Sequence, residues 1–183
     1  MTLAVLAGSD CERLRSALLA QPANAVSSGA FLAIGCWLIF RARRGAADPA
    51  VLLTGGPAMI AVGVGSVAYH GPQPGWADAV HAGAVAGLVA VVALHTARLS
   101  RQRTSRRAVL TAWRSAGMWM GLGLGAYVVG RSGSRWCSPA SLWQPHAAWH
   151  ILSAVALGRA LRGYARHSVI GSTRPPAYDR PRR

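Results

Sequence analysis

The chain has 183 residues, of which 52% are hydrophobic and 14% are charged, and its formal net charge is +15. The hydrophobic residues come in long blocks and not in the periodic stripes of soluble helices or strands, which argues against a soluble domain. The charge alone would suit a nucleic-acid-binding protein. The positions of the arginines, described below, argue against that class.

The first segment is predicted to lie outside the membrane. Residues 9–22 read SDCERLRSALLAQP, a mixture of apolar and charged positions that favours a short amphipathic helix ending before Pro22. We therefore expect residues 1–22 to form an outer N-terminal segment that contains this helix.

Five hydrophobic blocks follow, each close to the roughly 17–25 residues of a membrane-spanning helix once flanking residues are counted. They are rich in Gly and Ala, which suits close helix contacts in lipid. The blocks are residues 23–40, 50–69, 77–97, 116–130 and 147–161. The sequence predicts an all-α, polytopic transmembrane bundle of about five spans over residues 23–163. A disordered, basic cytoplasmic tail is expected over residues 164–183.

The basic residues, all of them arginine, cluster at alternate ends of the blocks. Clusters follow the first, third and fifth blocks, as in RARR (41–44) and RLSRQRTSRR (98–107). The opposite loops, 70–78 and 131–146, hold only Arg131 and Arg135. This is the positive-inside pattern. It predicts a multi-pass protein of the cell membrane with its N-terminus outside and its C-terminus in the cytoplasm, surrounded by lipid and with no nucleic-acid partner.

Polar residues from three blocks converge at the predicted outer level of the membrane. His70 closes the second block, and Ser66 lies one turn below it. Asp78 opens the third block, and His146 and His150 open the fifth. We therefore expect imidazole, carboxylate and hydroxyl groups from three helices at one depth.

The spacings of these residues suit a metal site. His146 and His150 are an i,i+4 pair, as are Ser66 and His70, so each pair shares a helix face. Three imidazoles plus water form the open arrangement of a catalytic zinc, which lowers the pKa of its water to roughly 7. Asp78 could then orient this water or take its proton, and Ser66 could hydrogen-bond a developing oxyanion.

Each of these residues also has a simpler interpretation. An interfacial histidine is often an amphipathic side chain at the lipid headgroups. A serine in a transmembrane helix usually bonds its own backbone or a neighbouring helix, and an aspartate at a helix start can be a cap. The convergence of all of them at one depth favours the metal site.

Two of the three cysteines fall on the outer side by the same topology. Cys11 lies in the N-terminal segment and Cys137 in the loop before His146, whereas Cys36 lies within the first block. A disulfide persists in an oxidising compartment. A Cys11–Cys137 bridge is therefore expected to join the N-terminal segment to this loop.

The chain resembles the alkaline ceramidase family, within the CREST superfamily of membrane hydrolases that also contains the adiponectin-type receptors. The likeness covers most of the chain and is specific at five places: CER (11–13), QPANAVSSGAF (21–31), SVAYH (66–70), Asp78 and HAAWH (146–150). It implies a zinc ion held by three histidines, a carboxylate and a hydroxyl that assist amide hydrolysis, and an outer disulfide. These would be His70, His146 and His150, Asp78 and Ser66, and Cys11 and Cys137.

The chain also departs from this family. Members usually have seven spans, so five would make this a short form, and the composition is typical of a GC-rich bacterial genome. The eukaryotic enzymes bind calcium near the N-terminus. Here Glu12 is retained, but Gln21 stands where an acidic ligand is expected, and Leu14 lies near the position of an Asn ligand. These changes argue against calcium binding and make Glu12 the vestige of such a site.

The predicted function is a zinc-dependent intramembrane hydrolase that cleaves an amide bond of a lipid-like, ceramide-like small molecule through a zinc-activated water. One alternative is a non-enzymatic membrane receptor or sensor in which the same zinc is structural. The other is a haem-binding electron carrier, because membrane helices often present paired histidines. The i,i+4 pair beside an aspartate suits zinc better than haem. The sequence carries no signal for an oligomeric state.

Overall fold

The computed structural model describes residues 10–45, 48–101 and 105–172. In this part of the chain every regular element is an α-helix, and the one strand-like feature is an isolated antiparallel bridge between Asp10 and Arg131. The helices are α1 (Pro22–Ser27), α2 (Gly29–Arg43), α3 (Pro49–His70), α4 (Ala77–Ser100), α5 (Ser105–Val129) and α6 (Pro145–Ser172). The all-α prediction is confirmed.

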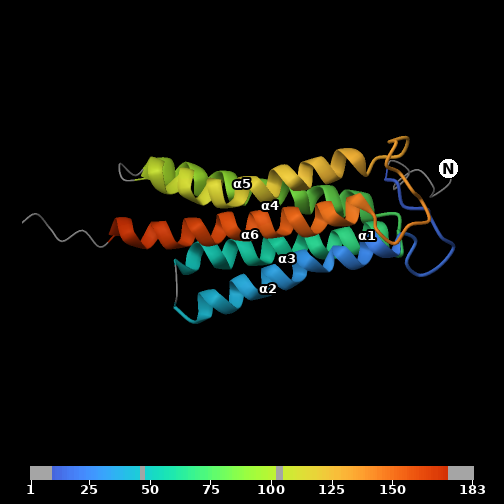
Figure 1. Cartoon of the computed structure of the whole chain (residues 1–183). Coiled ribbons are helices and arrows are strands. Elements are labelled where there is room, and N and C mark those ends of the chain that lie inside the picture. Colours follow the sequence, from blue (N-terminus) through green and yellow to red (C-terminus); the bar gives the residue numbers. More distant parts are fainter. Residues whose placement is uncertain (1–9, 46–47, 102–104, 173–183) are drawn as a thin grey trace, which may run out of the picture.

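The long helices lie side by side in an elongated bundle (Figure 1). The helix α6 is central, because it contacts each of the other five helices. The short helix α1 precedes α2 at one end of the bundle, where the segment before α1 and the loop between α5 and α6 also gather (Figure 1). Segments far apart in the sequence therefore meet at this end.

Three helical stretches are long and apolar enough to cross a membrane. They are Pro22–Arg43, Pro49–His70 and Ala77–Ser100, and they contain the first three predicted blocks. This identifies the chain as a membrane protein. The helices α5 and α6 have 25 and 28 residues; α5 contains the fourth block except for its last residue, and α6 contains the fifth. Their assignment as spans, like the orientation of the termini, stays a prediction.

The helices α2 and α3 pack backbone to backbone through glycine. A Cβ atom added to Gly35 would lie 2.7 Å from the carbonyl oxygen of Gly56, and one added to Gly56 would lie 2.9 Å from that of Gly35. These distances are shorter than any ordinary carbon–oxygen contact. Small residues therefore permit this approach, as the Gly- and Ala-rich blocks suggested.

The prediction of an amphipathic helix over residues 9–22 is wrong for the residues that the structure describes. Residues 10–21 form bends and loops, and their backbone groups pair with other segments. The N–H of Cys11 donates to the carbonyl oxygen of Gly130 (2.9 Å), and the N–H of Gln21 donates to that of His70 (2.8 Å). Tertiary pairing has thus replaced the local hydrogen bonds of a helix.

The bundle extends further at its C-terminal end than the expected boundary at residue 163. Helix α6 continues to Ser172. Tyr164 is fully buried, and its hydroxyl oxygen lies 2.8 Å from Oγ1 of Thr96 on α4. The start of the expected tail is therefore a packed helix. The rest of that tail, residues 173–183, lies outside the described residues.

The predicted disulfide between Cys11 and Cys137 is present, with 5.4 Å between the two Cα atoms. It joins the segment before α1 to the loop between α5 and α6. The two segments are 126 residues apart in the sequence. The bridge therefore holds these two distant segments together at one end of the bundle.

Candidate metal centre

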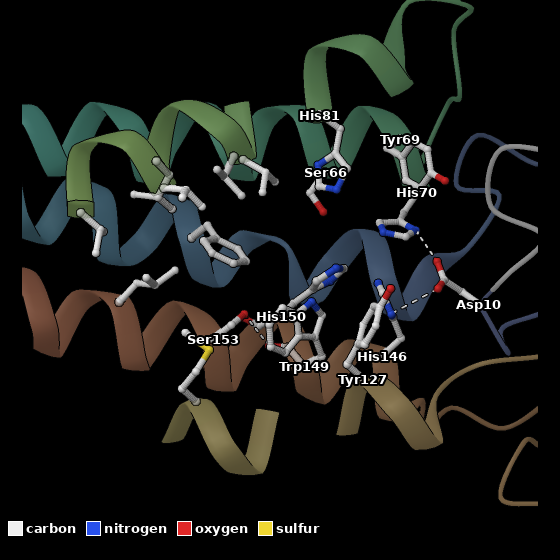
Figure 2. A pocket seen from close by; sticks show the side chains of 18 of the residues that line it. Asp10, Ser66, Tyr69, His70, His81, Tyr127, His146, Trp149, His150 and Ser153 are labelled. Carbon is white, nitrogen blue, oxygen red and sulfur yellow. Dashed lines mark hydrogen bonds and ion pairs between the residues drawn. The ribbon is translucent and has the colours of Figure 1, made fainter. Parts of the chain in front are cut away.

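Three buried histidines meet at the end of the bundle where these segments gather. His70 is the last residue of α3, and His146 and His150 lie in the first turns of α6. One ring nitrogen of each lies within 4.8 Å of the other two, as a shared metal ion requires. Figure 2 shows the three rings turned toward one another. The structure therefore brings together the three histidines that the sequence singled out.

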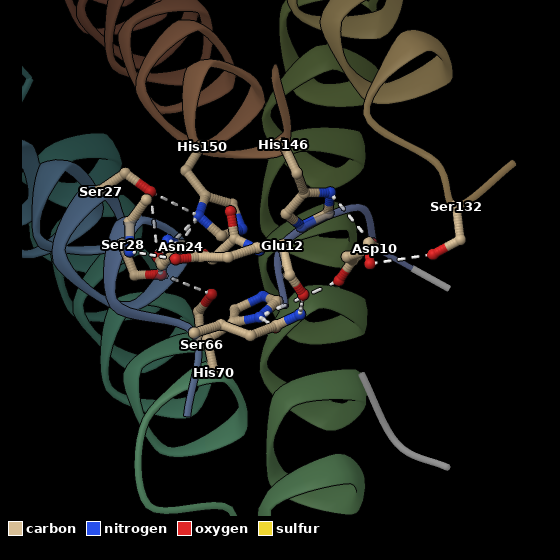
Figure 3. A network of polar contacts seen from close by, with 12 residues as sticks. Asp10, Glu12, Asn24, Ser27, Ser28, Ser66, His70, Ser132, His146 and His150 are labelled. Atoms are coloured by element: carbon tan, nitrogen blue, oxygen red, sulfur yellow. Dashed lines mark hydrogen bonds and ion pairs between the residues drawn. The ribbon is translucent and has the colours of Figure 1, made fainter. Parts of the chain in front are cut away.

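Each of the three rings has one nitrogen on the side away from the other two histidines, called its outer nitrogen below. The outer nitrogen of His150 contacts the start of the helical region. Its Nδ1 lies 3.1 Å from the carbonyl oxygen of Asn24 and 3.0 Å from the hydroxyl of Ser27 (Figure 3). A carbonyl oxygen can only accept a hydrogen bond, so Nδ1 carries the proton. The lone pair is therefore on Nε2, which is left for a metal ion.

The outer nitrogen of His70 has a similar partner. Its Nδ1 lies 2.7 Å from the amide oxygen of Gln21. The amide nitrogen of Gln21 donates to the carbonyl oxygen of Glu12 at 3.0 Å, which fixes the orientation of the amide. The ring of His70 therefore also carries its proton on Nδ1 and presents Nε2 to the other histidines.

The outer nitrogen of His146 faces a carboxylate. Its Nδ1 lies 3.3 Å from Oδ1 of Asp10, and Oδ2 of the same residue lies 4.0 Å from Nδ1 of His70 (Figure 2). Each ring therefore has an oxygen on its outer side. Such outer partners set the tautomer and the orientation of metal-ligating histidines. A set of three neutral imidazoles fits a metal ion.

Asp10 is buried, and its charge depends on this environment. Burial raises the pKa of its carboxyl group to about 6, while the nearby guanidinium of Arg131 opposes the rise and Glu12 adds to it. Because this pKa lies below neutrality, the carboxylate is mostly ionised at pH 7. An anion therefore stands beside two candidate metal ligands.

A cavity of about 910 Å³ begins at the three histidines and runs into the bundle. Its lining on α4 extends from Asp78 to Ala97, which at 1.5 Å per residue is about 28 Å. The walls beyond the histidines are mainly aliphatic, and Thr96 and Trp113 lie at the far end. Figure 2 shows polar side chains at one end of this cavity and apolar side chains at the other.

Ser66 is buried and lines the same cavity. Its hydroxyl lies 2.8 Å from that of Ser28, which lies 3.3 Å from Nδ1 of His150 (Figure 3). The Ser28 hydroxyl donates to the carbonyl oxygen of Asn24 at 2.7 Å, so Ser66 is the donor in its contact with Ser28. Ser66 is thus connected to a candidate ligand through one side chain.

Asp78 also lines the cavity, but it is exposed, in the first turn of α4. Within the described chain, no hydrogen bond or ion pair joins it to the three histidines. His81, one turn further along α4, lines the cavity and stacks on Tyr69 with 5.2 Å between the ring centroids. Asp78 therefore lines the cavity but makes none of the hydrogen bonds or ion pairs that surround the histidines in the described chain.

Glu12 helps to place α1. Its two carboxylate oxygens accept the backbone N–H groups of Ala23 (2.8 Å) and Asn24 (2.9 Å). These amides belong to the first turn of α1 and have no partner within the helix. Glu12 therefore fixes the turn whose Asn24 carbonyl and Ser27 hydroxyl contact His150.

The sequence interpretation missed the outer partners of the histidines: Asp10, Gln21, Asn24, Ser27 and Ser28. A signal for three of them was present. Asn24, Ser27 and Ser28 are spaced i, i+3, i+4 within an apolar block, which places their side chains on one helix face. Asp10 and Gln21 lie in a loop, where periodicity gives no such signal.

Comparison of the chain with models of protein families, with curated proteins and with solved structures found no match. The likeness to alkaline ceramidases therefore depends on the quoted residues alone.

Proposed function

We propose that this chain is a multi-pass membrane hydrolase of the cell membrane that uses zinc to cleave an amide bond in a lipid-like, ceramide-like molecule. One observation carries the proposal: three buried histidines meet at the head of a long apolar cavity. A metal site at that place would meet the polar group of a molecule whose hydrocarbon part fills the cavity.

The donor set fits zinc among the common metals. Three neutral imidazole nitrogens suit a borderline-soft ion and do not suit calcium or magnesium, which prefer oxygen. When bound by three protein ligands, zinc supplies a Lewis acid and a water whose pKa is near 7. His70, His146 and His150 would hold it through Nε2, because the outer side of each ring faces an oxygen.

Two further residues have roles in the proposed reaction. Asp78 lines the same cavity as the histidines, and its carboxylate would take a proton from the attacking water and return it to the leaving amine. Ser66 would donate to the oxyanion that forms from the substrate carbonyl. In the resting structure this hydroxyl donates to Ser28, so the role requires it to rotate toward the substrate.

The cavity supports an acyl chain as the hydrocarbon part. A volume of about 910 Å³ lies at the upper end of the range for small-molecule sites. Val85, Leu88 and Val92 of α4 lie along its length. Burial of hydrocarbon is favourable by about 0.8 kcal/mol for each CH₂ group. Long-chain substrates are therefore expected to be preferred over short ones.

The proposal is tested by turnover. Purified, zinc-loaded protein in detergent micelles is given N-acyl sphingoid amides with long and with two-carbon acyl groups, and release of the fatty acid is measured. We expect turnover of the long-chain amide, and little of the short-chain one because it leaves the apolar cavity empty. Zinc-loaded protein that cleaves neither these amides nor the matching esters would contradict the proposal and favour a zinc-binding receptor or sensor.

A further inference from the structure

Asp10 supplies the only carboxylate of the described chain whose oxygens lie within 4.0 Å of a ring nitrogen of the candidate metal ligands. It comes from an irregular segment, outside the three helices that the sequence brought together. Oδ1 lies 3.3 Å from Nδ1 of His146, and Oδ2 lies 4.0 Å from Nδ1 of His70. One side chain therefore reaches ligands on both α3 and α6.

The segment that carries Asp10 is fixed at several points. The hydroxyl of Ser132 donates to the backbone carbonyl of Asp10 at 3.0 Å, and the N–H of Cys11 donates to Gly130. The next residue along the chain, Cys11, is bonded to Cys137. The backbone that carries the carboxylate is therefore held beside the histidines by a covalent bridge and by hydrogen bonds, of which the Ser132 bond is drawn in Figure 3.

His146 differs from the other two histidines in its need for this carboxylate. The outer nitrogens of His70 and His150 have oxygens at hydrogen-bonding distance. Nδ1 of His146 is buried and makes no hydrogen bond within the described residues, and the Asp10 carboxylate at 3.3 Å faces it. An unsatisfied buried N–H is costly, so a small approach of the Asp10 carboxylate to Nδ1 of His146, which would form a hydrogen bond, is favourable.

We propose that Asp10 is a positioning residue for the metal site: its carboxylate fixes the tautomer and orientation of His146 and strengthens the imidazole as a ligand. A carboxylate behind a ligating histidine raises the basicity of the ring, and its removal typically weakens metal binding 10–100-fold. The inference rests on the three-histidine site of the proposed function, but it does not depend on hydrolysis.

The test measures zinc affinity of the full chain in detergent by competition with a chromophoric chelator. Asp10→Ala is expected to weaken zinc binding by up to about 100-fold, and Asp10→Asn by about 10-fold. Asparagine keeps the size and one acceptor oxygen but removes the charge. A role of Asp10 in packing alone would therefore leave the affinity of Asp10→Asn unchanged.

Asp48→Asn is the matched control. Asp48 caps the start of α3, at the opposite end of that helix from His70, where its carboxylate accepts the N–H of Ala50. Asp48→Asn removes the same charge far from the histidines, and it is expected to leave the zinc affinity of the chain unaltered. Thermal unfolding of each zinc-free variant shows whether it folds, and if Asp10→Ala does not, Asp10→Asn carries the test.

The outcomes separate the two proposals. Asp10→Asn with the zinc affinity of the wild type would overturn the positioning role. A wild-type chain that takes up no zinc would overturn both this role and the proposed zinc site. Normal zinc binding that weakens in Asp10→Asn, together with no hydrolysis in the wild type, would support the positioning role and contradict the proposed activity alone.

Discussion

Replacement of His150 by alanine is expected to weaken zinc binding by more than about 100-fold, because it removes a ligand and not only an outer partner. The side chain supplies one of three nitrogens, and the described residues place no other imidazole within the group. The measurement is zinc affinity by chelator competition in detergent, together with the zinc content after removal of unbound metal.

His95→Ala is the matched control for this variant. His95 is also buried in the bundle, but its Nε2 lies 2.8 Å from the hydroxyl of Thr54, and it does not belong to the three-histidine group. Its replacement is expected to leave zinc affinity unchanged. Zinc binding that survives in His150→Ala, or that falls equally in both variants, would show that the metal is held elsewhere or that the loss reflects unfolding.

Replacement of Asp78 by asparagine is expected to lower kcat for amide hydrolysis by about 10²–10⁴-fold, the usual contribution of general acid–base catalysis. Zinc content is expected to stay at the wild-type value, because no hydrogen bond or ion pair within the described chain joins Asp78 to the histidines. The measurement is fatty-acid release at saturating long-chain substrate, with zinc content determined on the same sample.

Asp48→Asn serves as the control for charge here as well, and its kcat is expected to match that of the wild type. A wild-type rate in Asp78→Asn would remove this carboxylate from the reaction. Loss of both the bound zinc and the hydrolysis rate would instead show that Asp78 is needed for metal binding and not for proton transfer.

The parts of the site on regular helices could be predicted from the sequence. The i,i+4 spacing of His146 and His150 places both on one face of α6, whatever the rest of the fold. The alternation of the arginine clusters then indicated that His70 ends its helix at the same level. The three histidines indeed meet, and the disulfide from Cys11 joins the two segments expected at that end.

The parts of the site on loops could not be predicted in the same way. Asp10 reaches the histidines because the backbone of its segment pairs with the loop after α5, and that pairing has no periodic signature. The same pairing explains why the expected helix over residues 9–22 was wrong. Local amphipathicity favoured a helix there, but hydrogen bonds and a covalent bridge to distant segments determined the structure.

The extent of the last helix was also set by tertiary contacts. The arginines and polar residues after residue 163 resemble a solvated tail, yet Tyr164 is fully buried and its hydroxyl contacts Thr96 on α4. Which helices lie near enough to bury such a residue depends on the packing of the whole bundle. Local composition therefore placed the end of the bundle too early.

The central claim is that His70, His146 and His150 bind one zinc ion, and the most direct test is the metal content of the wild-type chain. Protein purified in detergent is equilibrated with excess zinc, freed of unbound metal and examined by elemental analysis. We predict about one zinc ion per chain, the stoichiometry of a single three-histidine site. A chain that retains no zinc after this treatment would contradict the account.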